Sequence, residues 1–229
     1  AGGFAGGFFA VWCPSPEHEG DSHYDDDWKN PPYDVPLPEA LSLEYALPIA
    51  VAEIGHLMWM ERTGTLSICR SVADIRQAMA EGRIAAILHM EGAEAIGADL
   101  DALHVWHAAG LRSLGPVWSR PTAFGHGVPF RFPSSPDTGD GLTAAGKDLI
   151  RECNALKIMV DLSHLNEKGF NDVAAISDAP LVATHSNAHA VSPTARNLTD
   201  RQLRMIAESN GMVGLNYACS FLRPDGRQD

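Results

Sequence analysis

Three side chains that can bind a metal ion each come at the end of an apolar run of sequence. Glu91, His164 and His185 follow runs that predict three different strands. Histidines at equivalent ends of neighbouring strands lie roughly 5 Å apart, close enough to share one cation. Glu91 alone could equally be a helix cap or a surface acid, and a lone histidine is often a core residue. The three together favour a metal site.

Arg196 and Asn197 follow the segment that carries His185. A guanidinium at this place could hold a substrate carboxylate through two hydrogen bonds. The alternative, an arginine that bonds neighbouring carbonyl groups, is about equally favoured by the sequence. His189 stands four residues after His185, but Pro193 disfavours a helix there. We therefore expect His189 to be structural.

Alternating short apolar runs and longer helical patterns make up most of the chain. The predicted strands are Phe8–Trp12, Leu66–Cys69, Ile84–His89, Ser113–Val117, Ile158–Leu162, Leu181–Thr184 and Met212–Asn216. The predicted helices are Pro38–Arg62, Val72–Glu81, Leu100–Ala109, Ala144–Leu156, Glu167–Ser177 and Asp200–Ser209. Residues that cap helix N-termini precede several of them, and Thr199 with Gln202 fits a capping box.

This repeated strand and helix order predicts an α/β fold with a parallel sheet. A doubly wound sheet and a (β/α)8 barrel both satisfy the pattern, but no Gly-x-Gly-x-x-Gly sequence follows an early strand. Polar groups after several different strands favour the barrel. Residues 17–38 and 118–141 interrupt the rhythm, and we expect both to be long loops near the mouth of the site. His18 and His23, in the acidic first loop, are expected to be solvated.

The composition excludes some classes of function. The chain has 229 residues and a net charge of −12, which leaves no basic surface for nucleic acid. No apolar run approaches the roughly 20 residues that span a bilayer, so we expect no transmembrane segment. Its four scattered cysteines are typical of reduced thiols, and the sequence begins at Ala1 without a signal-peptide pattern, which together favour the cytoplasm.

Five motifs, in their order and spacing, resemble the membrane (renal) dipeptidase family of zinc metallopeptidases. They are His89-Met90-Glu91-Gly92, Gly141-Leu142-Thr143, Val160-Asp161-Leu162-Ser163-His164, Ala183-Thr184-His185-Ser186-Asn187-Ala188 and Arg196-Asn197-Leu198-Thr199-Asp200. The resemblance implies a TIM-like barrel of the amidohydrolase type with two zinc ions. It also implies hydrolysis of dipeptides, including those with a C-terminal D-residue.

Position by position, the resemblance makes Glu91 the carboxylate that bridges the two metals and a catalytic residue. It makes His164 and His185 the two histidines of one zinc, and Arg196 the group that binds the terminal carboxylate of the substrate. Asn197 is expected to contact the substrate beside it.

Two departures from the family bear on the site. Where many relatives carry a histidine, this chain has Trp118, which we expect at the substrate, and His126 could supply a catalytic imidazole from the same loop. The family's His-x-Asp pair and its late aspartate are absent. We therefore expect residues 1–229 to form one partial barrel domain that lacks the first and last strands.

The leading hypothesis is zinc-dependent hydrolysis of a small dipeptide by a hydroxide held between two metals. One alternative is another amidohydrolase-type reaction, on an amide or a lactone. The other is an inactive barrel-derived binding protein. A homodimer is left open.

Overall fold

The computed structural model describes residues 3–16 and 30–228. The strands are β1 (Gly6–Val11), β2 (Tyr33–Val35), β3 (Leu66–Ile68), β4 (Ile84–Glu91), β5 (Leu111–Gly115), β6 (Phe130–Phe132), β7 (Met159–Val160), β8 (Val182–Ala183) and β9 (Met212–Val213). The helices are α2 (Leu43–Arg62), α3 (Val72–Ala80), α4 (Asp101–Ala109), α5 (Ala144–Leu156), α6 (Glu167–Ile176) and α7 (Asp200–Glu208), with a short 3-10 helix at Cys219–Phe221.

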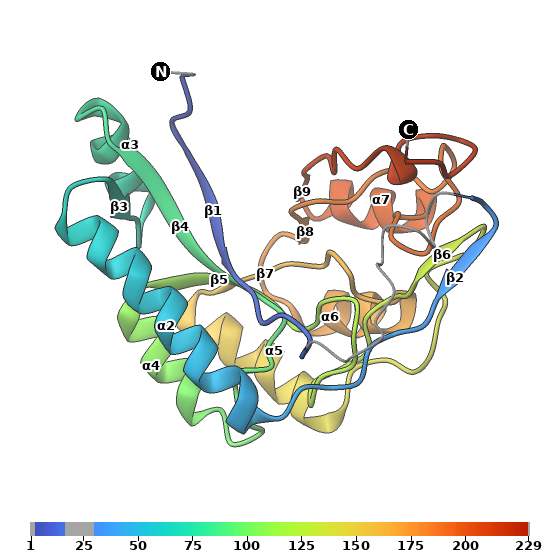
Figure 1. Ribbon diagram of the computed structural model, residues 1–229, viewed down its shortest axis with the longest axis horizontal. Coiled ribbons are helices and arrows are strands. Elements are labelled where there is room, and N and C mark those ends of the chain that lie inside the picture. Colours follow the sequence, from blue (N-terminus) through green and yellow to red (C-terminus); the bar gives the residue numbers. More distant parts are fainter. Residues whose placement is uncertain (1–2, 17–29, 229) are drawn as a thin grey trace.

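Parallel strands run through the molecule as a sheet of five strands and a pair, which a single bridge connects. Strands β1, β4, β5 and β7 pair in that order, β3 pairs with the first part of β4, and β8 pairs with β9. A parallel bridge between Asp161 and Val182 joins the end of β7 to β8. Figure 1 shows β1 and β4 on one side of the molecule, β8 and β9 on the other, and α2, α4 and α5 along the lower face. The predicted α/β fold with a parallel sheet is therefore confirmed. Within the described residues β1 and β9 do not pair, so closure into a barrel is not seen.

Apolar residues of the central strands and of the covering helices form the main core. Leu88 and Met90 of β4 and Leu114 of β5 are almost fully buried, and they pack with Leu149 and Ile150 of α5. This core holds the carboxyl ends of the strands in a fixed relation. Strand β4 continues to Glu91, so that residue is the last of its strand and does not follow it.

Most predicted element boundaries differ from the structure by a few residues. The largest difference is at α2, which begins at Leu43 and not at Pro38, because the Ser42 side chain accepts the N–H of Tyr45 and caps the helix there. Strand β5 begins two residues earlier than predicted. The capping box of Thr199 and Gln202 is confirmed.

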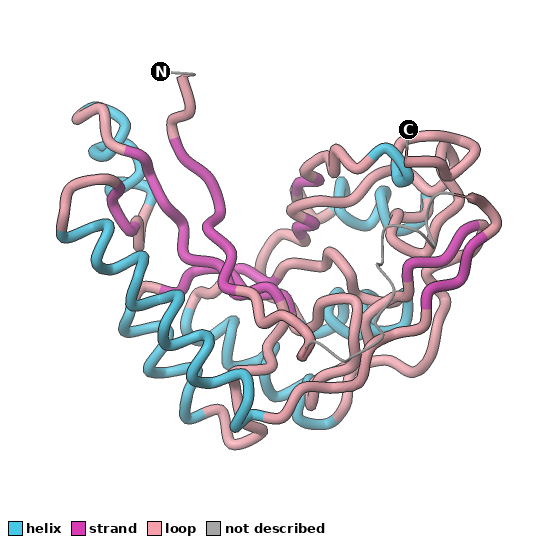
Figure 2. The backbone as a smooth tube through the Cα atoms, in the orientation of Figure 1, coloured by secondary structure: helices cyan, strands magenta, loops and turns pink. Residues whose placement is uncertain are grey.

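The two long segments predicted as loops each contain a short strand, which corrects that prediction. Strand β2 pairs with β6 in antiparallel register, and Asp34 forms an ion pair with Arg131 at 2.7 Å on the outer face. The inner face buries Val35 and Phe130. Residues 17–29, with His18 and His23, lie outside the described residues. The part of the molecule that carries β2, β6, β8 and β9 is richer in loops than the part that carries β1, β4 and α2 (Figure 2).

No helix in residues 3–16 and 30–228 combines the length and the apolar character that crossing a bilayer requires.

Candidate metal centre

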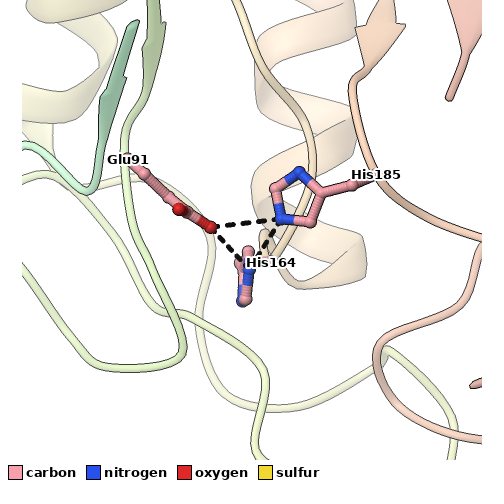
Figure 3. Close-up of side chains that lie close together, drawn as sticks. All are labelled: Glu91, His164 and His185. Carbon is pink, nitrogen blue, oxygen red and sulfur yellow. Dashed lines mark hydrogen bonds and ion pairs between the residues drawn. The ribbon is translucent and has the colours of Figure 1, made fainter. Parts of the chain in front are cut away.

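Glu91, His164 and His185 converge on one point at the carboxyl ends of the parallel strands. Oε1 of Glu91 lies 3.1 Å from Nε2 of His164 and 3.1 Å from Nε2 of His185, and the two Nε2 atoms are 3.0 Å apart (Figure 3). Glu91 ends β4, while the two histidines follow β7 and β8. They are the only group of three metal-binding side chains found within the described part of the chain. The structure thus brings together the three residues that the sequence assigned to a metal.

The three side chains differ in their access to solvent. His164 is 5% exposed, whereas Glu91 and His185 are 21% and 28% exposed. Burial would raise the pKa of Glu91, but the neighbouring imidazoles outweigh burial and hold that pKa well below its usual range. Burial and then the positive charge of Arg196 lower the pKa of His164 to about 3. At neutral pH the site therefore offers a carboxylate and a neutral imidazole.

The hydrogen bonds of His164 show which of its ring nitrogens carries a lone pair. Nη2 of Arg196 lies 3.2 Å from Nε2 of His164, and Ser119 Oγ lies 2.8 Å from Nδ1. A guanidinium has no lone pair to offer, so Nε2 must be the acceptor and the proton of the neutral ring sits on Nδ1. Nε2, which carries the lone pair, also lies at the meeting point with Glu91 and His185, where a cation would take that lone pair in place of Arg196. One carboxylate oxygen and two imidazole nitrogens are ligands that suit zinc, and this chain's donor atoms fit such an ion.

A buried polar cluster lies behind His185, and sequence reasoning assigned no role to it. Asp161, which is 1% exposed, accepts hydrogen bonds from the backbone N–H groups of Ser163 and Thr184 and from the Thr184 hydroxyl. Thr184 Oγ1 lies 2.7 Å from Nδ1 of His185, and His89 approaches Asp161 at 3.6 Å. Burial alone would raise the pKa of Asp161, but the imidazoles of His89 and His185 and the Thr184 hydrogen bonds outweigh burial and hold that pKa below its usual range. An aspartate inside the apolar run that ends at His164 was the available signal.

Trp12, Trp118 and Phe130 form an aromatic cluster beside the three candidate ligands. The ring of Trp118 packs edge-on against Trp12 and Phe130, and its centroid lies 5.9 Å from that of His164. The guanidinium of buried Arg120 stacks over Trp118 at 4.9 Å and bonds Glu94. The segment 118–141 thus borders the site.

Arg196 lies at the same point. It is 3% exposed, donates from Nη2 to the carbonyl of His185 at 3.1 Å, and lies 5.5 Å above the ring of Phe221. Its Nε is buried without a hydrogen-bond partner in the described structure. Burial lowers its pKa to about 10, although Glu91 and Asp161 oppose this shift. Arg196 remains cationic at neutral pH, with a donor left over for an anionic group.

The other predicted site residues have contacts of their own. Asn197 is buried, and its amide bonds the backbone of Asn187, Ser192 and Phe221, so it holds the segment that carries Arg196. His126 lines a cavity of about 490 Å³ together with Arg131 and residues of 34–37 and 137–139. His189 bonds the carbonyl of Ser134, as expected of a structural residue.

Known proteins resemble this chain in sequence and in fold. A crystallised metallopeptidase from Rhodobacter sphaeroides, liganded with a phosphinate mimic of the dipeptide L-Ala-D-Ala, is 66% identical with a TM-score of 0.96 over 99% of this chain. An uncharacterized protein in the PQQ-III 3' region of Acinetobacter calcoaceticus is 44% identical over 99% of this chain and 70% of its own length. The match to an amidohydrolase from Pseudomonas aeruginosa has a TM-score of 0.71 and 24% identity, and it covers 82% of this chain and 56% of the length of that protein. At this identity the match shows the fold alone.

This chain spans 65% of the length of the Rhodobacter sphaeroides metallopeptidase. The family model described as membrane dipeptidase (peptidase family M19) matches residues 1–228. The fold, the relatives and this match agree, and the chain belongs to the membrane dipeptidase family of metallopeptidases.

Proposed function

We propose that the protein is a metal-dependent dipeptidase and that zinc is its metal. The observation that carries the proposal is the convergence of Glu91, His164 and His185 beside a buried arginine with a free donor. Membership of a metallopeptidase family supports a metal, and the dipeptide mimic bound to the Rhodobacter sphaeroides relative supports a small peptide substrate.

Glu91, His164 and His185 would hold one ion, and the carboxylate of Glu91 would reach a second. A zinc ion in such a place supplies Lewis acidity towards the scissile carbonyl and favours deprotonation of water. Glu91 contributes a negative charge that its surroundings keep ionised. The partial exposure of Glu91 and His185 leaves one side of the site open to substrate.

Arg196 would bind the free carboxylate of the dipeptide. A carboxylate that met Nε would give this buried atom the partner it lacks and form a charge-assisted pair. The ring of Phe221 supports the guanidinium from below, and Asn197 fixes its segment. This arrangement favours a substrate with a free C-terminus.

Trp118 would bound the substrate on the side of His164. We also propose that His126 supplies an imidazole from the segment 118–141 to the incoming substrate. His126→Ala is then expected to lower kcat/KM for dipeptides about 100-fold, at the lower end of the usual contribution of a general acid or base group. An unchanged kcat/KM would remove His126 from the site.

The arginine contact can be tested with matched substrates. L-Ala-D-Ala and its C-terminal amide differ in the charge that Arg196 would bind, so the protein should hydrolyse the free dipeptide at least 10-fold faster in kcat/KM. Arg196→Met should remove most of this preference. Arg201→Met is the control, because Arg201 bonds Glu167 and Asn171 on the surface. Equal rates on both substrates would instead favour a hydrolase of another amide or a lactone.

The proposal also includes the cellular compartment of the protein. The described structure leaves Cys13, Cys69, Cys153 and Cys219 as free thiols. Free thiols are typical of the reducing cytoplasm, and we propose that location.

A further inference from the structure

A short line of hydrogen bonds runs from the interior of the fold to the back of one metal ligand. The carboxylate of Asp161 receives the Thr184 hydroxyl at 2.5 Å, and Thr184 Oγ1 in turn lies 2.7 Å from Nδ1 of His185. The opposite ring nitrogen, Nε2, is the atom that faces Glu91 and His164. The line therefore ends at the metal centre.

The direction of each hydrogen bond follows from counting protons. Oδ1 of Asp161 accepts the backbone N–H groups of Ser163 and Thr184, and Oδ2 accepts the single proton of the Thr184 hydroxyl. With its proton committed to Asp161, Thr184 Oγ1 is only an acceptor towards His185. Nδ1 of His185 must then carry a proton, so Nε2 is the ring nitrogen left to bind a metal ion.

We propose that Asp161 and Thr184 are positioning residues that fix the ring orientation and the tautomer of His185, so that Nε2 is presented to the metal. This inference rests on the proposed metal centre and adds a supporting pair to it. His164 shows the same outcome by a different route, because Ser119 lies at its Nδ1. Outer partners of this kind orient ligating histidines in metal sites and strengthen their binding.

Further contacts hold Asp161 and the ligand segments in place. Asp161 is held by the backbone on both sides of the bridge that joins β7 to β8, so its carboxylate cannot turn away from Thr184. Ser163 Oγ accepts the backbone N–H of His185, which anchors the main chain of the ligand to the same cluster. His89, whose Nδ1 pairs with Ser113 Oγ, faces Asp161 from β4. The strands that carry the ligands are thus connected through one carboxylate.

Two substitutions at position 184 separate the hydroxyl from the rest of the side chain. Thr184→Val keeps the shape and removes the hydrogen bonds, whereas Thr184→Ser keeps the hydroxyl. We expect the affinity for zinc, measured by competition with a coloured chelator, to fall about 10- to 100-fold in Thr184→Val and to recover most of the way in Thr184→Ser. Thr122→Val is the matched control, because the Thr122 hydroxyl bonds only the backbone of 116 and 124.

Proton NMR of the zinc-loaded protein gives a second readout that does not depend on activity. The Nδ1–H of His185 should appear as a slowly exchanging signal in the wild type and in Thr184→Ser, and should be lost or exchange faster in Thr184→Val. Unchanged zinc affinity and an unchanged signal in a folded Thr184→Val protein would overturn the inference and leave the metal centre standing. A wild-type protein that binds no zinc would overturn the metal centre itself.

Discussion

At the scale of single residues, the site depends on a carboxylate whose charge is costly to bury. Glu91 is mostly buried, and the imidazole of His164 is neutral at pH 7, so it brings no full charge to offset the carboxylate. Arg196 supplies one positive charge nearby, and its own pKa is lowered by burial. A bound divalent cation would offset the remaining negative charge of the site. The charge balance therefore favours these side chains as metal ligands over a purely structural cluster.

Glu91→Gln tests this balance. The substitution keeps the size of the side chain and removes its charge, so we expect zinc affinity to fall by at least about 10-fold and dipeptide hydrolysis to fall further. Isothermal titration with zinc measures the first effect. Glu81→Gln is the control, because Glu81 lies on the surface at the end of α3. Zinc binding by Glu91→Gln at wild-type affinity would exclude Glu91 as a ligand.

At the scale of elements, the ends of β4, β7 and β8 could be placed from the sequence because each is a buried apolar run followed by polar residues. Strands β2 and β6 could not. Each has three residues in a proline-containing segment, and each is stabilised by a partner far along the chain, a contact that local pattern does not report. The supporting roles of Asp161 and Thr184 were missed for a related reason, since they depend on which side chains meet across strands.

The β2–β6 pair gives a prediction about its two faces. Phe130 is 7% exposed and packs against Trp118, His164 and Phe221. Phe130→Ala should therefore lower the free energy of unfolding by about 3–5 kcal/mol. Asp34→Ala removes only an exposed ion pair and should cost less than about 1 kcal/mol.

Urea denaturation followed by tryptophan fluorescence measures both variants. Equal destabilisation by the two substitutions would mean that the inner face of the β2–β6 pair does not hold the aromatic cluster of Trp12, Trp118 and Phe130 in place.

At the scale of the whole molecule, the proposed metal centre joins parts that are distant in sequence. Its proposed ligands come from the ends of β4, β7 and β8, on a parallel sheet that the described residues leave open between β1 and β9. A cation bound to all three would therefore tie together segments that otherwise meet only through pairing and packing. Stability and metal content should be linked in this protein.

Zinc removal tests that link. Binding to the folded state alone at 100 times the dissociation constant adds about 2.7 kcal/mol to the free energy of unfolding. The thermal midpoint of the zinc-loaded protein should lie measurably above that of the chelator-treated protein, by differential scanning calorimetry. The shift should be lost in His164→Ala. A midpoint that does not depend on zinc would show that the ion does not bind the folded state.

The most direct measurement of the central claim is hydrolysis of L-Ala-D-Ala before chelation, after chelation and after zinc is restored. The protein is predicted to release alanine, to lose that activity when the metal is removed and to regain it with zinc. Hydrolysis that resists complete metal removal, or no hydrolysis with zinc bound, would contradict the account.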